Sequence, residues 1–137
     1  MASRIRQVEY FHATVKDRPG EAYQLLSQLA GSGVALLAFS AVPAGVEHTQ
    51  LMLFPESVEA LLRAAASEGL VLSGPQHALL IQGDDELGAL AEVHRQLSAG
   101  GVNVYASTGV ADGQGGFGYV VFLRSEDIDR AAGILGI

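Results

Sequence analysis

The stretch of sequence that decides the fold is residues 17–34 (DRPGEAYQLLSQLAGSGV), which returns 68 residues later, without a gap, as residues 85–102 (DELGALAEVHRQLSAGGV). The two stretches share their first Asp, the Gly three positions on, a Gln-Leu pair and a closing Gly-Val. The correspondence continues to Ser57 and Ser125. A twofold repeat is not a solenoid, which needs about three stacked units. It indicates two copies of one small module, and a cleft between such modules is a common ligand site.

Composition excludes several classes of protein. The 137 residues carry a formal net charge of −7 and no cysteine. The acidic balance, with no basic cluster, argues against a nucleic-acid partner, and the lack of cysteine excludes disulfides and thiolate metal sites. With no apolar leader segment and no stretch of membrane-spanning length, we expect a soluble, cytoplasmic protein with no membrane partner. Each copy, of about 68 residues, is near the lower limit for folding alone, so we expect the halves to unfold together.

The hydrophobic pattern predicts the order βαββαβ, then βαββα. In the first copy we expect strands at 5–16, 34–42, 49–54 and 70–73, a helix opened by residues 17–20, and a second helix capped by Ser57. In the second copy we expect strands at 77–82, 102–110 and 117–123, with a last helix capped by Ser125. The fold class is therefore α+β, with two ferredoxin-like modules at 1–74 and 76–137 and a short linker at Gly74-Pro75. Each antiparallel sheet carries its helices on one face, and the second module lacks its last strand.

Two features predict a homodimer. Residues 51–54 and 119–123 are apolar on both faces of their strands, although a sheet covered on one side needs only alternation. The second face would otherwise be a large exposed apolar patch. The missing last strand also leaves an open edge in the second module unless a partner chain covers it.

The candidate chemistry lies in the two loops where a strand turns into a helix. Asp17 and Gly20 recur as Asp85 and Gly88, and the N-terminus of a helix favours an anion such as a carboxylate. Simple helix capping is the alternative explanation. The four histidines are not at ligand spacing, so we expect no metal. Residues 113–118 (GQGGFG) lie in a hairpin and not between a strand and a helix, so they do not fit a dinucleotide motif. We expect no catalytic residues and no cofactor.

These residues resemble the ACT domain family, whose small βαββαβ modules regulate amino-acid metabolism by binding amino acids. The first copy carries the resemblance in residues 15–20, 23–29 and 31–34, and the second in residues 85–90, 94–97 and 100–104. It covers the whole chain, as a tandem pair with no attached catalytic domain. It implies that the two copies pair through their second strands. It also implies that an amino acid binds between modules, touching the Asp-to-Gly loop of one and the start of the second strand of the other.

That pairing leads to a composite site. It joins Asp17, Arg18, Pro19 and Gly20 with Asn103, while the twin site joins Asp85 and Gly88 with Ala35. The amide of Asn103 can hold an ammonium or a carboxylate, whereas Ala35 offers nothing polar. We therefore expect one competent site per chain. Alternatively, Asn103 only shapes the turn that follows Gly101.

Two other functions remain open from the sequence. The chain could be an interaction module that keeps the shape and has lost the ligand. It could also be a small hydrolase on a ferredoxin-like fold, since this fold hosts many functions. A hydrolase of acyl phosphates would need an arginine loop for phosphate, and Arg18 is the only arginine in either loop.

Overall fold

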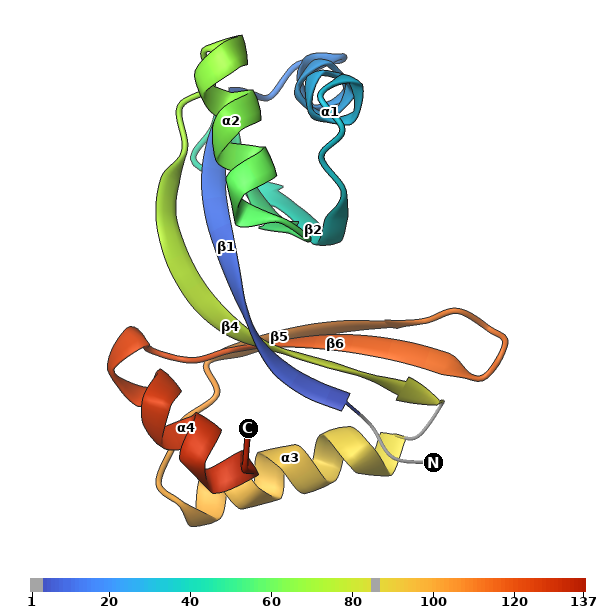
Figure 1. Ribbon diagram of the computed structural model, residues 1–137, viewed down its shortest axis with the longest axis vertical. Coiled ribbons are helices and arrows are strands. Elements are labelled where there is room, and N and C mark those ends of the chain that lie inside the picture. The colour runs from blue at the N-terminus through green and yellow to red at the C-terminus, as the bar shows by residue number, and fades with distance from the viewer. Residues whose placement is uncertain (1–3, 85–86) are drawn as a thin grey trace. The chain divides into compact units, whose positions relative to one another are not determined.

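The computed structural model describes residues 4–84 and 87–137 and shows an α+β fold (Figure 1). The elements are β1 (Arg4–Lys16), α1 (Glu21–Gly31), β2 (Leu36–Pro43), β3 (His48–Pro55), α2 (Val58–Glu68), β4 (Ser73–Asp84), α3 (Leu87–Ala99), β5 (Ala106–Ala111), β6 (Gly116–Phe122), a 3-10 turn (Ser125–Asp127) and α4 (Ile128–Leu135). The predicted fold class is confirmed. Among the described residues, no helix is long and apolar enough to cross a bilayer.

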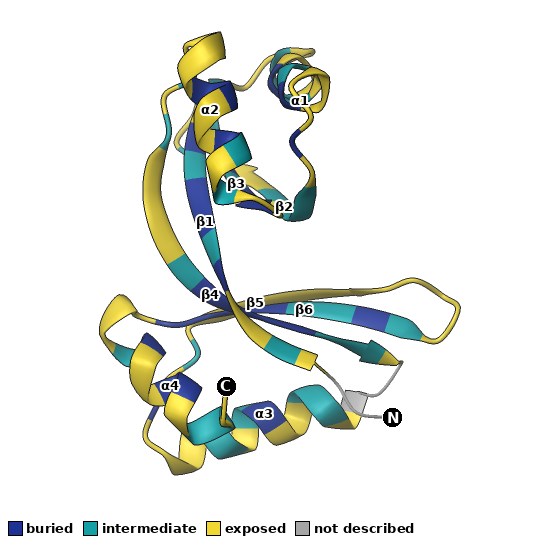
Figure 2. Cartoon of the chain, viewed as in Figure 1, coloured by how far each residue is buried: buried dark blue, intermediate teal, exposed yellow. Residues whose placement is uncertain are grey.

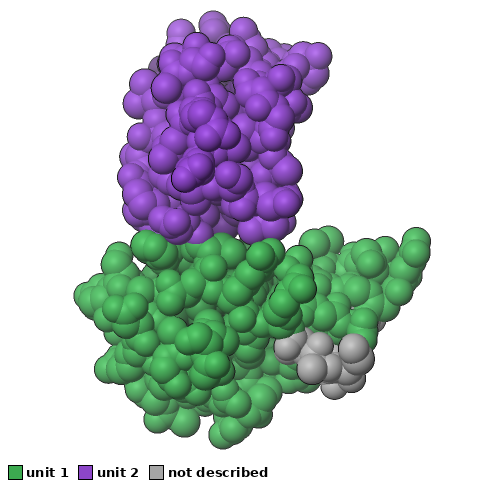
Figure 3. All heavy atoms as spheres, in the orientation of Figure 1, with its two compact units in different colours: residues 1–8, 77–137 green, residues 9–76 purple. Residues whose placement is uncertain are grey.

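The chain forms two compact units, one of residues 9–76 and one of residues 1–8 with 77–137 (Figure 3). The division falls within β1 and within β4, so each of these two strands contributes residues to both units. The strand order is β2-β3-β1-β4-β6-β5. Both units therefore contain an antiparallel sheet with one part of β1 and one part of β4.

In the unit of residues 9–76, β3 pairs with both β1 and β2, and Phe11 lies opposite Leu53. These two side chains belong to one core with Leu25 and Leu29 of α1 and Leu61 of α2. Because alternate residues of a strand share a face, both helices cover the same face of this sheet. The apolar spacing predicts Leu61 and Leu62 of α2 as inward positions; Leu61 is buried as predicted, but Leu62 is 47% exposed, so that position is wrong.

The unit that contains residues 77–137 repeats this arrangement. β6 pairs with both β4 and β5, with Leu79 opposite Val121. The core joins these residues to Val93 and Leu97 of α3 and Ala131 of α4. The helical spacing of three and four residues that predicted α3 and α4 thus corresponds to their buried faces.

The start of β1 takes the place of the missing last strand of the second module. β1 is the neighbour of β4 in the sheet, and residues 1–8 belong to the unit of residues 77–137. Ile5 packs against the core of that unit, and the guanidinium of Arg4 donates to the side-chain oxygen of Gln82 at 3.3 Å. The expectation of an open edge beside the first strand of the second module is therefore wrong, because the chain covers that edge itself.

β4 continues through Gly74 and Pro75, where the sequence predicts a linker between two short strands. Gly74 has φ of 134°, and a Cβ there would lie 3.0 Å from the carbonyl oxygen of Tyr10 and 3.1 Å from a ring carbon of Phe11. A residue without a side chain lets the backbone of β4 approach β1 this closely. The glycine thus marks close strand contact at this point.

The second strand of each module begins later than its apolar pattern predicts. The N–H of Val34 donates to the carbonyl of Leu29 at 3.0 Å, and that of Val102 donates to Leu97 at 2.8 Å. These bonds close the C-terminal ends of α1 and α3, as is common where a glycine ends a helix. Val34 and Val102 are buried in the two cores without joining the strand ladder.

The two serines predicted as caps differ in outcome. The hydroxyl of Ser57 accepts a hydrogen bond from the N–H of Ala60 at 3.2 Å and caps α2, as predicted. Ser125 does not cap α4. It starts a 3-10 turn in which the N–H of Asp127 donates to the carbonyl of Arg124 at 2.9 Å, and α4 begins only at Ile128.

The doubly apolar strands are buried within the single chain. Leu53 and Phe54, which point to opposite faces of β3, are at most 2% exposed, and Val121 and Phe122 of β6 are at most 6% exposed. Neither strand presents an exposed apolar face, so this reason for expecting a dimer is wrong. The exposed strands are β2 in its second half and β5 over its whole length (Figure 2).

Candidate functional site

The loop of residues 17–20 connects β1 to α1 and is exposed throughout. Gly20 is the N-cap residue of α1 and has a left-handed backbone with φ of 90°, which favours glycine. No side chain caps this end of α1 in the described chain, so N–H groups of the first turn are left for solvent or a ligand. Arg18 forms an ion pair with Glu21 at 2.9 Å.

A pocket of about 380 Å³ lies beside this loop, and we call it the loop pocket. It is lined by Lys16, Asp17, Arg18, Val46, Glu47 and His48. The N–H of Asp17 donates to the carbonyl of Glu47 at 2.8 Å, which holds the loop against the turn between β2 and β3. The lining thus contains two cationic side chains, Lys16 and Arg18, and two carboxylates, Asp17 and Glu47. Its volume is within the range of small-molecule sites.

The structure brings two of the predicted site residues, Asp17 and Arg18, into the loop pocket, while Pro19 and Gly20 form the turn next to it. The sequence analysis missed Lys16, Val46 and Glu47, and considered His48 only as a metal ligand. No local signal in the sequence points to them, because they meet through the pairing of β1 with β3, in which Lys16 lies opposite His48. Val46 is at the tip of the β2–β3 turn and is 94% exposed.

The corresponding loop of the second module is not equivalent. Asp85 lies outside the described residues. Gly88 is in the first turn of α3, which begins at Leu87, and it does not have the positive φ of Gly20. The two loops also differ at the position before the glycine, where the first has Pro19, and a proline disfavours helical geometry in the residue before it. Pro19 therefore keeps Arg18 out of α1, whereas Leu87 places no such limit on α3.

Asn103 is exposed and lies three positions before β5, whereas Ala35, its counterpart in the repeat, immediately precedes β2. In the sheet, β2 has β3 as its one neighbour and β5 has β6. The pairing of second strands within a chain, which joined Asn103 to the first loop, is therefore not formed.

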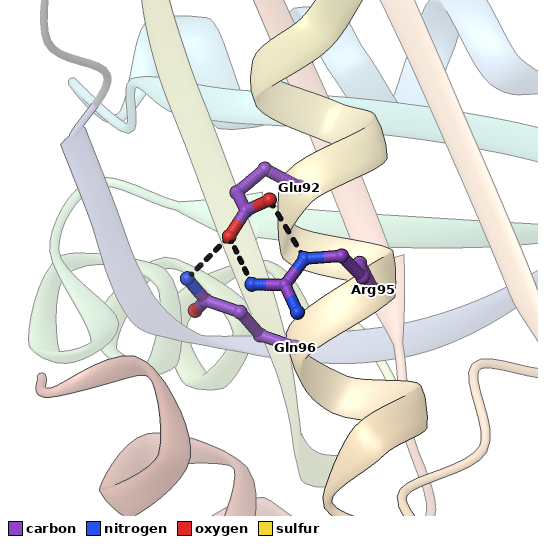
Figure 4. Close-up of polar contacts among 3 residues, drawn as sticks. All are labelled: Glu92, Arg95 and Gln96. Atoms are coloured by element: carbon purple, nitrogen blue, oxygen red, sulfur yellow. Dashed lines mark hydrogen bonds and ion pairs between the residues drawn. The ribbon is translucent and has the colours of Figure 1, made fainter.

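An exposed polar cluster on α3 lies outside the predicted site (Figure 4). The carboxylate of Glu92 accepts from Nε of Arg95 at 2.9 Å, from a second guanidinium nitrogen at 2.6 Å and from the amide of Gln96 at 2.9 Å. The hydrogen bonds from Arg95, and then that from Gln96, lower the pKa of Glu92 to about 2. All three side chains come from successive turns of one helix, so they stabilise α3 on its solvent side.

The glycine-rich hairpin between β5 and β6 is organised by Asp112. Its carboxylate accepts from the N–H of Gln114 at 2.7 Å and from that of Gly116 at 3.0 Å, and these bonds lower the pKa of Asp112. Side-chain bonds of this kind are typical of turns. The described residues contain no group of three histidine, aspartate or glutamate side chains that could hold a metal ion.

Neither a protein-family model nor a curated protein matches this sequence. Several solved structures, however, are similar to this chain. The chain is similar to protein BT0572 from Bacteroides thetaiotaomicron, with a TM-score of 0.79, 17% identity and coverage of 96% of this chain and 88% of that one. It is also similar to the regulatory subunit of aspartate kinase from Thermus thermophilus in its ligand-free form (TM-score 0.60, 16% identity, coverage of 98% and 94%). A third match is the structure of aspartokinase alpha and beta subunits (0.53, 16%, 98% and 95%).

These similarities span nearly the whole chain and nearly the whole of each matched chain. At this level of identity they show the fold. The chain has the tandem ferredoxin-like fold of the ACT-type regulatory domains of aspartate kinase, and the predicted resemblance is confirmed in that respect.

Proposed function

We propose that this chain is a non-catalytic regulatory protein that binds a free amino acid in the loop pocket. The observation that carries this assignment is the charge pattern of the lining, in which Lys16 and Arg18 face the same pocket as Asp17 and Glu47. An α-amino acid has one carboxylate and one ammonium, so a pocket with both signs of charge complements it. A pocket for a phosphate or a simple carboxylate would be expected to carry cations alone.

Two further features support a carboxylate at this place. The N-terminus of α1 has no side-chain cap, and its dipole favours an anion. Arg18 donates to Glu21 with one nitrogen, and a guanidinium has five N–H donors, so others can serve a ligand. Asp17 and Glu47 are then the partners for the ligand ammonium.

The regulatory assignment is supported by the fold shared with the regulatory subunit of aspartate kinase. We propose a homodimer in which a second copy adds to the exposed edge of β2 or β5. Asn103, which precedes β5, would contribute to a ligand site through such a contact. We propose one amino acid per chain, because Gly88 does not reproduce the turn of Gly20. We propose that the protein carries out this function in the cytoplasm.

Titration calorimetry of the full chain with the twenty amino acids tests this function. We expect one ligand per chain and roughly tenfold weaker binding in Arg18→Gln and in Asp17→Asn, since each loses a hydrogen bond to a charged group. Arg63→Gln is the matched control, because Arg63 is exposed on α2 and lies outside the loop pocket. Binding that is the same in all three variants would exclude this pocket. A dimer that binds none of the twenty would instead favour an interaction module.

A further inference from the structure

A second pocket of about 320 Å³ lies against α1, and we call it the helix groove. Its walls come from the last residues of β1, from one face of α1 and from the turn that follows α2, all within the unit of residues 9–76. Leu25, which is 6% exposed, lies at its apolar side. Its polar lining includes Thr14, Gln24 and Gln28.

The charge of the helix groove differs from that of the loop pocket. Its lining contains two carboxylates, Glu21 and Glu68, and no lysine, arginine or histidine. Glu21 is paired with Arg18, whereas Glu68 has no ion-pair partner among the described residues. The groove therefore offers one carboxylate that no ion pair neutralises in the part of the chain that the structure describes.

The end of α2 adds to this negative potential. α2 ends at Glu68 with Gly69 as a left-handed C-cap, and both Gly69 and Leu70 line the helix groove. The C-terminus of a helix carries a partial negative charge, and α2 has no basic residue in its last turn to offset it. The amide oxygens of Gln24 and Gln28, one turn apart on α1, are further acceptors.

We infer that the helix groove binds a primary ammonium carried on a short aliphatic chain. The ammonium has three donors for the carboxylate of Glu68 and the glutamine oxygens, and the aliphatic chain packs along Leu25 and Val15. This site is separate from the loop pocket and does not depend on amino-acid binding there. Its ligand carries one positive charge, and binding does not require a carboxylate on the ligand.

The test uses n-butylammonium chloride as the probe and backbone amide NMR of the full chain as the readout. We expect saturable shifts at Thr14, Gln24 and Gln28, and none with n-butanol or sodium butyrate at equal concentration. N-acetyl-lysine methylamide tells the two sources of this ligand apart. Binding as tight as that of butylammonium indicates a lysine side chain of a partner, and weaker binding indicates a free amine.

Three variants make the inference falsifiable. Glu68→Gln should weaken butylammonium binding about fivefold, the upper range for an exposed charge pair. Glu59→Gln is the matched control, since it makes the same change on α2 outside the groove and should leave binding unchanged. Gln24→Arg, which places a cation in the groove on a helix that tolerates arginine, should abolish binding. Shifts that do not saturate, an equal response to n-butanol, or full affinity in Gln24→Arg would overturn the inference.

Discussion

The two repeated glycines, Gly20 and Gly88, should respond in opposite directions to the same substitution. Gly20 has φ of 90°, and an added Cβ would meet nothing within 4 Å. Gly88 lies in the first turn of α3 with an ordinary φ, and a Cβ there would also meet nothing. Steric contacts are therefore absent in both cases, and the backbone conformation alone decides the effect of alanine.

The magnitudes follow from that difference. A left-handed backbone costs an ordinary L-residue about 1–2 kcal/mol, so Gly20→Ala should lower the free energy of unfolding by that amount. In a helix interior alanine is more favourable than glycine by about 0.8–1.0 kcal/mol, and near a helix end the gain is smaller. Gly88→Ala should therefore be neutral or stabilising by up to that amount. At roughly 4 °C per kcal/mol for a chain of this size, the two Tm values should differ by about 4–12 °C.

Urea and thermal unfolding followed by circular dichroism measure both variants. Gly20→Asn is the control, because asparagine tolerates the left-handed region better than alanine and should destabilise less. A loss in Gly88→Ala equal to that in Gly20→Ala would refute the difference between the two loops. A larger loss of unfolding free energy in Gly20→Asn than in Gly20→Ala would also refute it.

Three other substitutions probe the fold. Gly74→Ala should cost about 2–3 kcal/mol in urea unfolding, because φ of 134° and a 3.0 Å contact with the backbone of β1 both oppose a side chain; a neutral result would contradict the close strand contact. Ser57→Ala should cost about 1 kcal/mol and Ser125→Ala less than 0.5, since the first hydroxyl alone caps a helix; equal losses would contradict this. The carboxyl of Glu92 should titrate near pH 2 by carbon NMR and return toward 4.5 in Arg95→Ala. Because its pKa is lowered on folding, its stabilisation is present above pH 4.5 and is lost as the pH falls toward 2.

Much of this fold could be predicted from the sequence because its signals are local. The spacing of Leu25 and Leu29, and of Val93 and Leu97, marks helix faces that the structure buries. The cap at Ser57 depends on a bond between residues three apart. Such short-range patterns are in the chain itself, and they need no knowledge of what packs against them.

The rest depends on long-range pairing, which the sequence pattern does not contain. Residues 4–16 alternate as one strand, and nothing in that alternation says that its two parts have different partners. The loop pocket likewise forms because Lys16 lies opposite His48, 32 positions along the chain. The recurrence of Gly20 as Gly88 wrongly suggests two equivalent loops. Equal residues take different conformations there, since Gly20 precedes α1 with φ of 90° whereas Gly88 lies within the first turn of α3.

The sharing of β1 and β4 between the compact units has a consequence for stability. Residues 4–8 of β1 complete the sheet of the unit that also contains residues 77–137, while the remainder of β1 carries the chain to Asp17 and the loop pocket. If one unit unfolds, the other therefore loses the continuity of a strand in its own sheet, and the stability of each is linked to the other. A ligand that binds the folded form at the loop pocket stabilises that form by mass action. Because each unit contains part of both strands, we expect such a ligand to raise the midpoint of one common unfolding transition and not to stabilise one unit alone.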